Sequence, residues 1–297
     1  MSFVASPSVR AYAAQHDVGL ERLARSIGRE TLAREDVDRY LAGGTEPLTD
    51  HQAGHSRYWD VDHAQFGPVS TVPMPRMAQV AAANLAAANT MIPQVTHHDH
   101  ADMRAVEAFR ASLKAEGTRR GVKITALAFH VKVLARCLID FPKFNASVSV
   151  DGATIIQKHF VHIGIAIDTP HGLMVPVIRN ADQMGLWQIA TRITDLATRA
   201  LARKIRPDEM GGASMTISNL GGIGGSAFTP IVNPPELAIL GLTRSEMRPV
   251  WDGTTWQPVP MTPLDLSYDH RVINGADAAR FLNRFASLMA EPRRLMI

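Results

Sequence analysis

Strand-like and helical segments follow one another in an irregular order between residues 75 and 285, and this order restricts the fold more than any other feature. Strand-like runs stand at 93–103, 147–157, 159–169, 173–180, 214–220, 236–243, 248–259 and 262–269. Helical periodicity occupies 75–91, 103–119, 124–141, 187–204 and 276–285. Several strand-like runs adjoin without a helix between them, and Asp151-Gly152 is a hairpin signal. The order therefore predicts an α+β fold with a mixed-sheet sandwich rather than a regular βαβ fold.

The first 44 residues predict a small all-α unit. Ser6 stands at an N-cap position, with Pro7 at the first helical position of a helix over 6–16. Residues 18–28 predict a short turn-rich link, and a second helix is expected over 33–42. The next segment is polar and contains Gly and Pro, which is typical of a linker. The predicted divisions are a small all-α module at 1–44, a linker at 45–56 and a larger domain at 57–297.

Composition excludes several classes of function. The net charge is only +3 and the basic residues are spread along the chain, which argues against a nucleic-acid surface. No apolar run reaches the roughly 18 residues of a membrane span, and we expect no secretory signal at the N-terminus. The single cysteine, Cys137, lies in an apolar run and predicts a buried structural thiol. One cysteine suits a reducing compartment, so we expect a cytoplasmic protein.

A histidine stands between the last strand-like run and the last helix. The stretch SYDHRVING places His270 where a strand ends, and side chains at such an edge can face a cleft. An imidazole with a pKa of about 6.5 can accept a proton from a thiol, and general-base help is typically worth ~10²–10⁴ in rate. A turn histidine with a capping role is the alternative on spacing alone.

A serine precedes a glycine-dense loop in a similar way. In SMTISNLGGIGG, Ser218 stands at the end of a strand, where its hydroxyl could donate a hydrogen bond to an oxyanion. The glycines could let the backbone approach a ligand closely. A serine with only a turn role remains the alternative.

Two other motifs carry little weight. Residues 222–227 fit G-x-G-x-x-A, but three prolines follow where a dinucleotide site needs a helix. Residues 97–100 read HHDH, and on a strand His98 and His100 share one face while His97 and Asp99 share the other, so each face has too few ligands for zinc. We therefore expect no nucleotide cofactor and no metal.

Four stretches together resemble a known family. SYDHRVINGADAARF, TISNLGGIGGSAFTPIVNPPELAILG, MIPQVTHHDHADM and KITALAFHVKVLA are similar to the catalytic domain of dihydrolipoamide acyltransferases, the core subunits of 2-oxo-acid dehydrogenase complexes. RPVWDGTTWQP and the ending EPRRLMI are most similar to the acetyl-transferring, pyruvate-type members from proteobacteria. The first forty residues resemble the family's peripheral subunit-binding domain.

The resemblance implies a chloramphenicol-acetyltransferase-like fold that works as a trimer, with active sites in channels between subunits. His270 matches the general base, and Ser218 matches the oxyanion donor supplied by the neighbouring subunit. Coenzyme A enters as a substrate, and dihydrolipoamide carries the acetyl group. The implied partners are dihydrolipoamide dehydrogenase and the 2-oxo-acid dehydrogenase component, for which Arg10 and Arg29 are candidate contacts. The apolar C-terminus implies trimers joined into a cubic core.

The chain departs from the family pattern in three places. Asn274 replaces the aspartate of D-H-R-x-x-D-G, and because an amide carries no charge we expect it to position neighbouring groups. Arg271 is expected to pair with a carboxylate. The binding module retains only Gly28 of its usual glycine loop. No Asp-Lys-Ala lipoyl acceptor occurs, so the lipoyl group is expected from elsewhere.

Three other functions remain open at this point. The chain could be a non-catalytic scaffold subunit, although the presence of His270 argues against that. It could transfer succinyl or branched-chain acyl groups. It could also be another acyltransferase of the same fold, although a docking module at the N-terminus argues against a free-standing enzyme.

Overall fold

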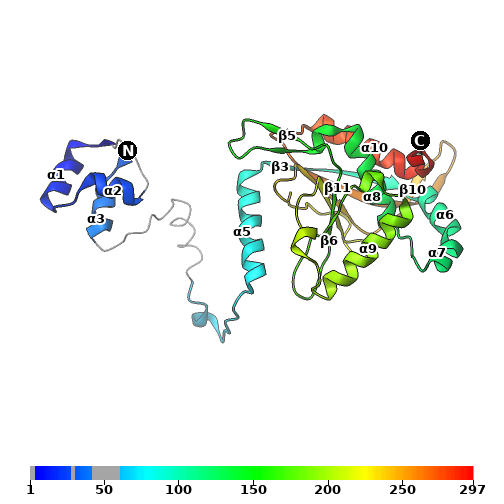
Figure 1. Cartoon of the computed structure of the whole chain (residues 1–297), viewed down its shortest axis with the longest axis horizontal. Helices are drawn as coiled ribbons and strands as arrows, with labels where there is room; N and C mark the ends of the chain where they lie inside the picture. Colours follow the sequence, from blue (N-terminus) through cyan, green and yellow to red (C-terminus); the bar gives the residue numbers. More distant parts are fainter. Residues whose placement is uncertain (1–3, 28–30, 42–60, 297) are drawn as a thin grey trace. The chain divides into compact units, whose positions relative to one another are not determined.

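The computed structural model describes residues 4–27, 31–41 and 61–296, which form two compact units (Figure 1). Contacts within the chain separate residues 1–73 from residues 74–297. The whole of the predicted linker, 45–56, lies outside the described residues, so the three predicted divisions stay a prediction. No helix in the described ranges is both long and apolar enough to cross a membrane.

In its described residues, the N-terminal unit contains three short α-helices, one 3₁₀ helix and one pair of parallel two-residue strands. Ser6 accepts a hydrogen bond from the backbone N–H of Val9, 3.3 Å away, which confirms its predicted N-cap position. The predicted turn-rich link is wrong, because a helix covers most of it. Leu20, Leu23 and Ile27 recur at helical spacing, and Leu23 packs in the unit's small core. The elements are β1 (Val4–Ala5), α1 (Pro7–Gln15), α2 (Leu20–Ile27), β2 (Thr31–Leu32) and α3 (Arg34–Leu41).

The larger unit is built on one seven-stranded mixed sheet, which confirms the predicted fold class. Its strands are β3 (Gln94–Asp102), β6 (Ile163–Ala166), β7 (Val177–Ile178), β8 (Met215–Asn219), β9 (Ala238–Leu242), β10 (Glu246–Trp251) and β11 (Trp256–Asp269). β6, β8 and β9 are parallel neighbours, whereas the pairings of β11 with β9, β3 and β10 are antiparallel. The strands predicted at 248–259 and 262–269 are divided differently, because β10 ends at Trp251 and β11 then runs for 14 residues without a break. The hairpin expected at Asp151-Gly152 joins β4 (Ala146–Val148) to β5 (Ile155–Gln157).

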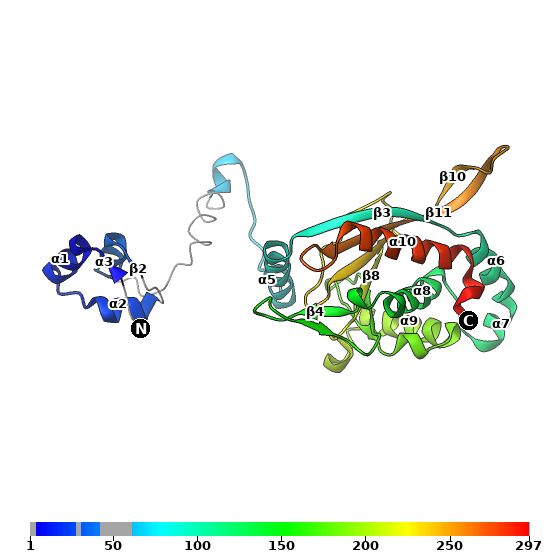
Figure 2. The ribbon, with the colours of Figure 1, turned by 90° about the horizontal axis from the view of Figure 1, so that it is seen from above.

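Helices α8, α9 and α10 cover one face of this sheet (Figure 2). The predicted helix over 103–119 is divided into two at Leu113. The α-helices are α5 (Arg76–Met91), α6 (Arg104–Ser112), α7 (Lys114–Arg120), α8 (Ala126–Asp140), α9 (Leu186–Leu201) and α10 (Gly275–Ala290). Short 3₁₀ helices are η1 (His63–Phe66), η2 (Pro142–Phe144), η3 (Ala181–Gln183), η4 (Pro207–Glu209) and η5 (Pro292–Met296).

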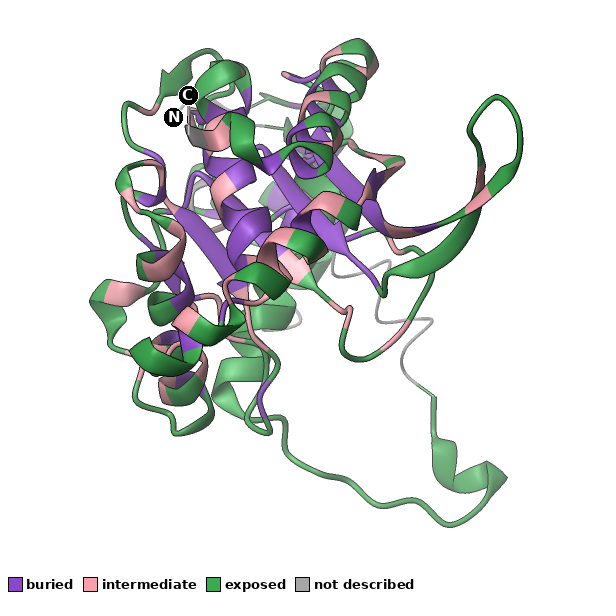
Figure 3. Cartoon of the chain, turned by 90° about the vertical axis from the view of Figure 1, so that its right-hand side faces the viewer, coloured by how far each residue is buried: buried purple, intermediate pink, exposed green. Residues whose placement is uncertain are grey.

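The two faces of the sheet differ in chemistry. Side chains that face the helices are apolar and buried, as the purple strands and helix sides in Figure 3 show; they include Ile163, Met215, Ile217, Leu240 and Leu266. Successive side chains of a strand point to opposite faces, so the intervening residues lie on the face away from the helices. That face carries polar groups, namely Thr96, His98, Thr216, Ser218, Asp265, Ser267 and Asp269. We call it the polar face.

Candidate active site

His270 lies directly beyond the end of β11. Its backbone N–H donates to the carbonyl oxygen of Pro93, 3.1 Å away, which ties the turn to the start of β3. Its side chain is exposed, and the ring lies beside the buried ring of Tyr268, with 5.8 Å between centroids. The predicted base is therefore accessible and held at a strand end.

One ion pair holds the turn that carries His270, and it joins the two residues on either side of this histidine. Asp269 is 1% exposed and accepts hydrogen bonds from the Arg271 guanidinium at 2.6–3.1 Å. The backbone N–H of Arg271 donates to the same carboxylate at 3.0 Å. These hydrogen bonds raise the pKa of Arg271, so the pair stays charged. The predicted structural pairing of Arg271 with a carboxylate is confirmed.

Asn274 is the N-cap of α10. Its side-chain oxygen accepts from the backbone N–H of Asp277 at 2.9 Å, and the Asp277 carboxylate lies 3.5 Å from the backbone nitrogen of Asn274. The hydrogen bond from Lys143 lowers the pKa of Asp277. Within one chain, Asn274 thus fixes where the helix starts after His270, as expected of a residue that positions its neighbours.

Ser218 lies near the end of β8, half-buried, on the polar face. The loop 220–237 that follows contains no helix, whereas a dinucleotide-binding fingerprint requires a helix that begins at the glycine-rich turn. The loop is tied back at its middle and near its end. The backbone N–H of Phe228 donates to Asp265 at 3.3 Å, and Glu236 accepts from Thr216 at 2.9 Å. The glycine-rich segment is therefore held against the sheet beside Ser218.

Ser218 and His270 do not meet within one chain. Ser218 pairs with Gly241, and Gly241 pairs with Asp265, so two interstrand steps separate the serine from β11. His270 is five residues further along β11. At about 4.8 Å per interstrand step and 3.4 Å per residue, the two Cα atoms are about 19 Å apart. A hydrogen-bonded site would need the side chains within about 3 Å, so each chain presents half of the predicted site.

Two polar features of this face are missing from the sequence-based predictions. His98 Nδ1 lies 2.6 Å from a carboxylate oxygen of Asp265, on the neighbouring strand. Glu236 is 4% exposed, and burial raises its pKa to about 7. The HHDH motif drew attention to His98, but its partner lies far away in sequence. No group of metal-binding side chains occurs in the part of the chain that is described.

The predicted partner contacts fall in the N-terminal unit. The guanidinium Nε of Arg10 donates to the carbonyl oxygen of Ala5 at 3.1 Å, so this side chain also supports the unit's own fold. Arg29 and Gly28 lie outside the described residues.

The fold and the site define an acyltransferase of a known family. Residues 66–297 match the family described as "2-oxoacid dehydrogenases acyltransferase (catalytic domain)". The chain belongs to this family.

Its relatives include bacterial dihydrolipoyllysine-residue acetyltransferase components of pyruvate dehydrogenase complexes. The chain is 44% identical to the one from Azotobacter vinelandii over 300 residues, which cover 99% of this chain and 47% of the relative. It is also 44% identical to the one from Pseudomonas aeruginosa, covering 99% of this chain and 55% of the relative. The chain spans about half the length of these curated relatives.

Solved structures support the same fold. One comes from a study of the role of a serine, a histidine and an asparagine in the catalytic mechanism of A. vinelandii dihydrolipoamide acetyltransferase. It superposes with a TM-score of 0.79 at 49% identity, covering 80% of this chain and 98% of that one. A structure of the cubic core of the pyruvate dehydrogenase multienzyme complex gives a TM-score of 0.79 at 50% identity with the same coverage.

Proposed function

We propose that this protein transfers an acetyl group between S-acetyldihydrolipoamide and coenzyme A as part of a pyruvate dehydrogenase complex. One observation carries the proposal. The serine, histidine and asparagine studied in the A. vinelandii enzyme stand at the same intervals along the chain as Ser218, His270 and Asn274. The asparagine at position 274, which departs from the general family pattern, thereby has a counterpart in that enzyme.

His270 acts as the general base in this proposal. The sulfur of coenzyme A attacks the carbonyl carbon of the thioester while the imidazole takes its proton. Ser218 of an adjacent subunit donates a hydrogen bond to the oxyanion of the tetrahedral intermediate. The intermediate collapses when the bond to the lipoyl sulfur breaks. That sulfur takes the proton back from the imidazolium, so acetyl-coenzyme A and dihydrolipoamide leave and His270 is neutral again.

The separation of about 19 Å between Ser218 and His270 supports a site formed between subunits. We propose trimers assembled into a cubic core, with the C-terminus contributing to the contacts between trimers. Deleting residues 295–297 and measuring the particle mass in solution tests the last point. A smaller particle is expected, and an unchanged large particle would count against it.

The N-terminal unit is proposed as a peripheral subunit-binding domain over residues 1–44, followed by a linker at 45–56 and the catalytic domain at 57–297. Its partners are dihydrolipoamide dehydrogenase, the 2-oxo-acid dehydrogenase component, or both, with Arg10 and Arg29 as contacts. The lipoyl group comes from another segment or polypeptide, and the complex works in the cytoplasm. Titration with dihydrolipoamide dehydrogenase tests the docking role, and absence of a complex would refute that partner.

The acetyl-transfer assay uses acetyl-coenzyme A and free dihydrolipoamide and follows thioester formation. His270→Ala is expected to lower the rate by ~10²–10⁴, because the base is lost. Ser218→Ala is expected to lower it by ~10²–10³, because one oxyanion donor is lost. His63→Ala, in the other unit, is the control for removing a histidine. Equal rates for all the proteins would contradict the proposed mechanism.

A further inference from the structure

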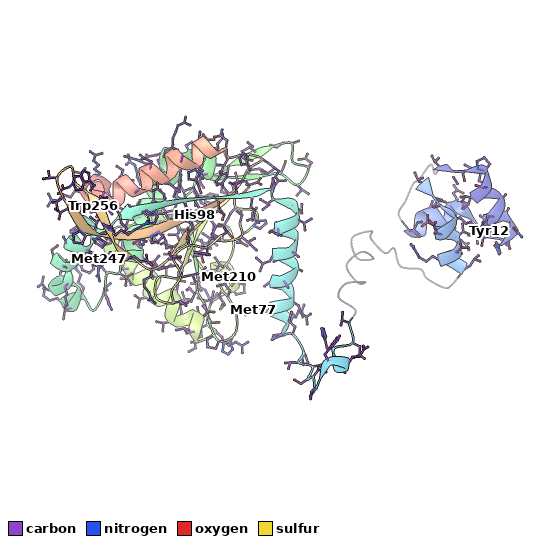
Figure 4. The ribbon with its side chains drawn as sticks, turned by 180° about the vertical axis from the view of Figure 1, so that it is seen from behind. Tyr12, Met77, His98, Met210, Met247 and Trp256 are labelled. Atoms are coloured by element: carbon purple, nitrogen blue, oxygen red, sulfur yellow. The ribbon has the colours of Figure 1, made fainter. Side chains whose placement is uncertain are left out.

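The polar face carries a histidine–carboxylate pair that the acetyl-transfer mechanism does not use. His98 on β3 and Asp265 on β11 are register partners, and Nδ1 of the imidazole lies 2.6 Å from Oδ1 of the carboxylate. Figure 4 shows His98 on β3 where that strand runs beside β11. Asp265 is 1% exposed, whereas 48% of the His98 side chain is accessible. A buried carboxylate therefore orients an imidazole that a ligand can reach.

The geometry assigns roles to the two ring nitrogens. A carboxylate only accepts hydrogen bonds, so Nδ1 of His98 carries the hydrogen and Nε2 of the neutral ring is an acceptor. The other oxygen of Asp265 accepts from the backbone N–H of Phe228 at 3.3 Å. Both oxygens of the carboxylate are thus occupied, and Nε2 remains able to accept an N–H from a ligand.

His98 lines a cavity of about 400 Å³. Its walls combine polar side chains of β3 and β11, Gln94, Thr96 and Ser267, with the apolar Pro230 and Ile231 of the loop after Ser218. No lysine or arginine is among the lining residues in the described part of the chain, and the Asp265 carboxylate lies directly behind His98. This lining suits a neutral ligand with a hydrocarbon part and an amide, and it does not suit phosphate groups.

The cavity is connected to the proposed reaction centre by strand register. Ser218, Gly241, Asp265 and His98 form one row across β8, β9, β11 and β3. Three interstrand steps place His98 about 14 Å from Ser218, measured between Cα atoms. The Phe228 ring covers Gly241 in the middle of this row, since a Cβ on Gly241 would lie 2.7 Å from it. An apolar surface therefore separates the oxyanion donor from the imidazole.

We propose that His98, oriented by Asp265, is a specificity-determining residue that accepts a hydrogen bond from the amide N–H of dihydrolipoamide. The proposal rests on the proposed acetyl transfer. Dihydrolipoamide is neutral, with its thiols at one end of a short saturated chain and its amide at the other. Its thiols react near Ser218, its chain packs along Phe228, and its amide reaches His98. Coenzyme A carries phosphate groups, which this lining does not match.

The test compares two acceptors with the same dithiol chain and carbonyl, one of which has an N–H donor, because the ester carries –OCH3 in place of –NH2. Initial rates are measured with acetyl-coenzyme A and either dihydrolipoamide or the methyl ester of dihydrolipoic acid. His98→Phe is expected to lower kcat/KM for dihydrolipoamide about 2- to 10-fold, the effect of one neutral hydrogen bond. The change is expected in KM rather than kcat, because the contact is remote from the reacting atoms. The kcat/KM for the ester and the KM for acetyl-coenzyme A stay at their wild-type values.

Asp265→Asn is the second variant. With the amide oxygen on the Phe228 N–H, the amide NH2 faces Nδ1 of His98 and donates to it, so Nε2 carries the hydrogen and no longer accepts; the same loss of discrimination between amide and ester is expected. His97→Asn, on the opposite face of β3, is the matched control and should keep wild-type values. Equal effects of His98→Phe on amide and ester, an effect on acetyl-coenzyme A alone, or no effect would each overturn the assignment while acetyl transfer stands. A wild-type protein without any transfer would overturn the proposed function itself.

Discussion

The proposed sharing of active sites between subunits leads to a complementation experiment. Because Ser218 and His270 are about 19 Å apart in one chain, the proposed mechanism requires the serine of one copy and the histidine of another. A protein with His270→Ala still supplies the serine, and a protein with Ser218→Ala still supplies the base. Subunits of the two variants, mixed in one assembly, should therefore rebuild intact sites.

The size of the recovery follows from symmetry. In a cyclic assembly each site lies between two adjacent copies, and in a random one-to-one mixture about half of the copies carry each substitution. An intact site needs both correct neighbours, so about a quarter of the sites are expected to be intact. Each variant alone should retain about 1% or less of the wild-type rate, so the recovered activity stands well above this background.

The assay uses co-expression of the two variants with different tags, purification over both tags, and initial rates of acetyl transfer per subunit. The control is a mixture of the separately assembled variants, which exchange no subunits and should stay inactive. A doubly tagged assembly with no more activity than either parent variant would refute the shared site. That result would also show that Ser218 and His270 of one chain lie closer together than the strand register indicates.

Three further predictions concern buried groups. Burial raises the pKa of Glu236 from 4.5 to about 7, so the folded chain holds a proton that the unfolded chain releases, and stability falls as the pH rises through this range. Glu236→Gln should remove this fall, which is worth up to about 3 kcal/mol, and a Tm at pH 8 no higher than wild type would refute it. Burial lowers the pKa of His130 from 6.5 to about 4, so stability falls as the pH drops through that interval. His130→Phe should flatten the dependence of Tm between pH 6.5 and 4, and an unchanged slope would contradict the assignment. Gly241→Ala would place a Cβ 2.7 Å from the Phe228 ring and should destabilise the fold by about 1–3 kcal/mol in urea unfolding, whereas an unchanged midpoint would show that the ring moves freely.

Local patterns predicted most helices because their signals lie within a few residues. The apolar helix α8 ends at Asp140, just before Pro142, and α10 starts at Gly275, one residue before the predicted start. The link predicted over 18–28 failed for a physical reason. Helix α2 presents Leu20, Leu23 and Ile27 to a core that exists only when α1 and α3 are in place. The helix has only eight residues, and its apolar positions are too few to show a clear helical period without that core.

The two halves of the candidate site were each predictable, whereas their spatial relation was not. Ser218 and His270 stand at strand ends, and strand ends can be located from alternation and loop composition. Their separation depends on β9 lying between β8 and β11, and on the register of both pairings. Register follows from contacts across the whole sheet, so one chain's sequence leaves it open.

The polar face could also be predicted only in part from the sequence. The run LDLSYD at 264–269 alternates strictly, which predicts one apolar and one polar face for this strand. Buried polar groups are costly unless they are hydrogen-bonded, and each polar residue of the run has a partner in the structure. Two of these partners come from a distant segment, His98 for Asp265 and Thr96 for Ser267, whereas Asp269 pairs with Arg271 in the adjoining turn. A strand buried on both faces would carry apolar residues at these positions. A face next to Ser218 whose polar side chains are hydrogen-bonded is instead the arrangement expected of a surface that receives a ligand. The sequence therefore contains the alternation that marks such a surface, and only the sheet register reveals which histidine completes it.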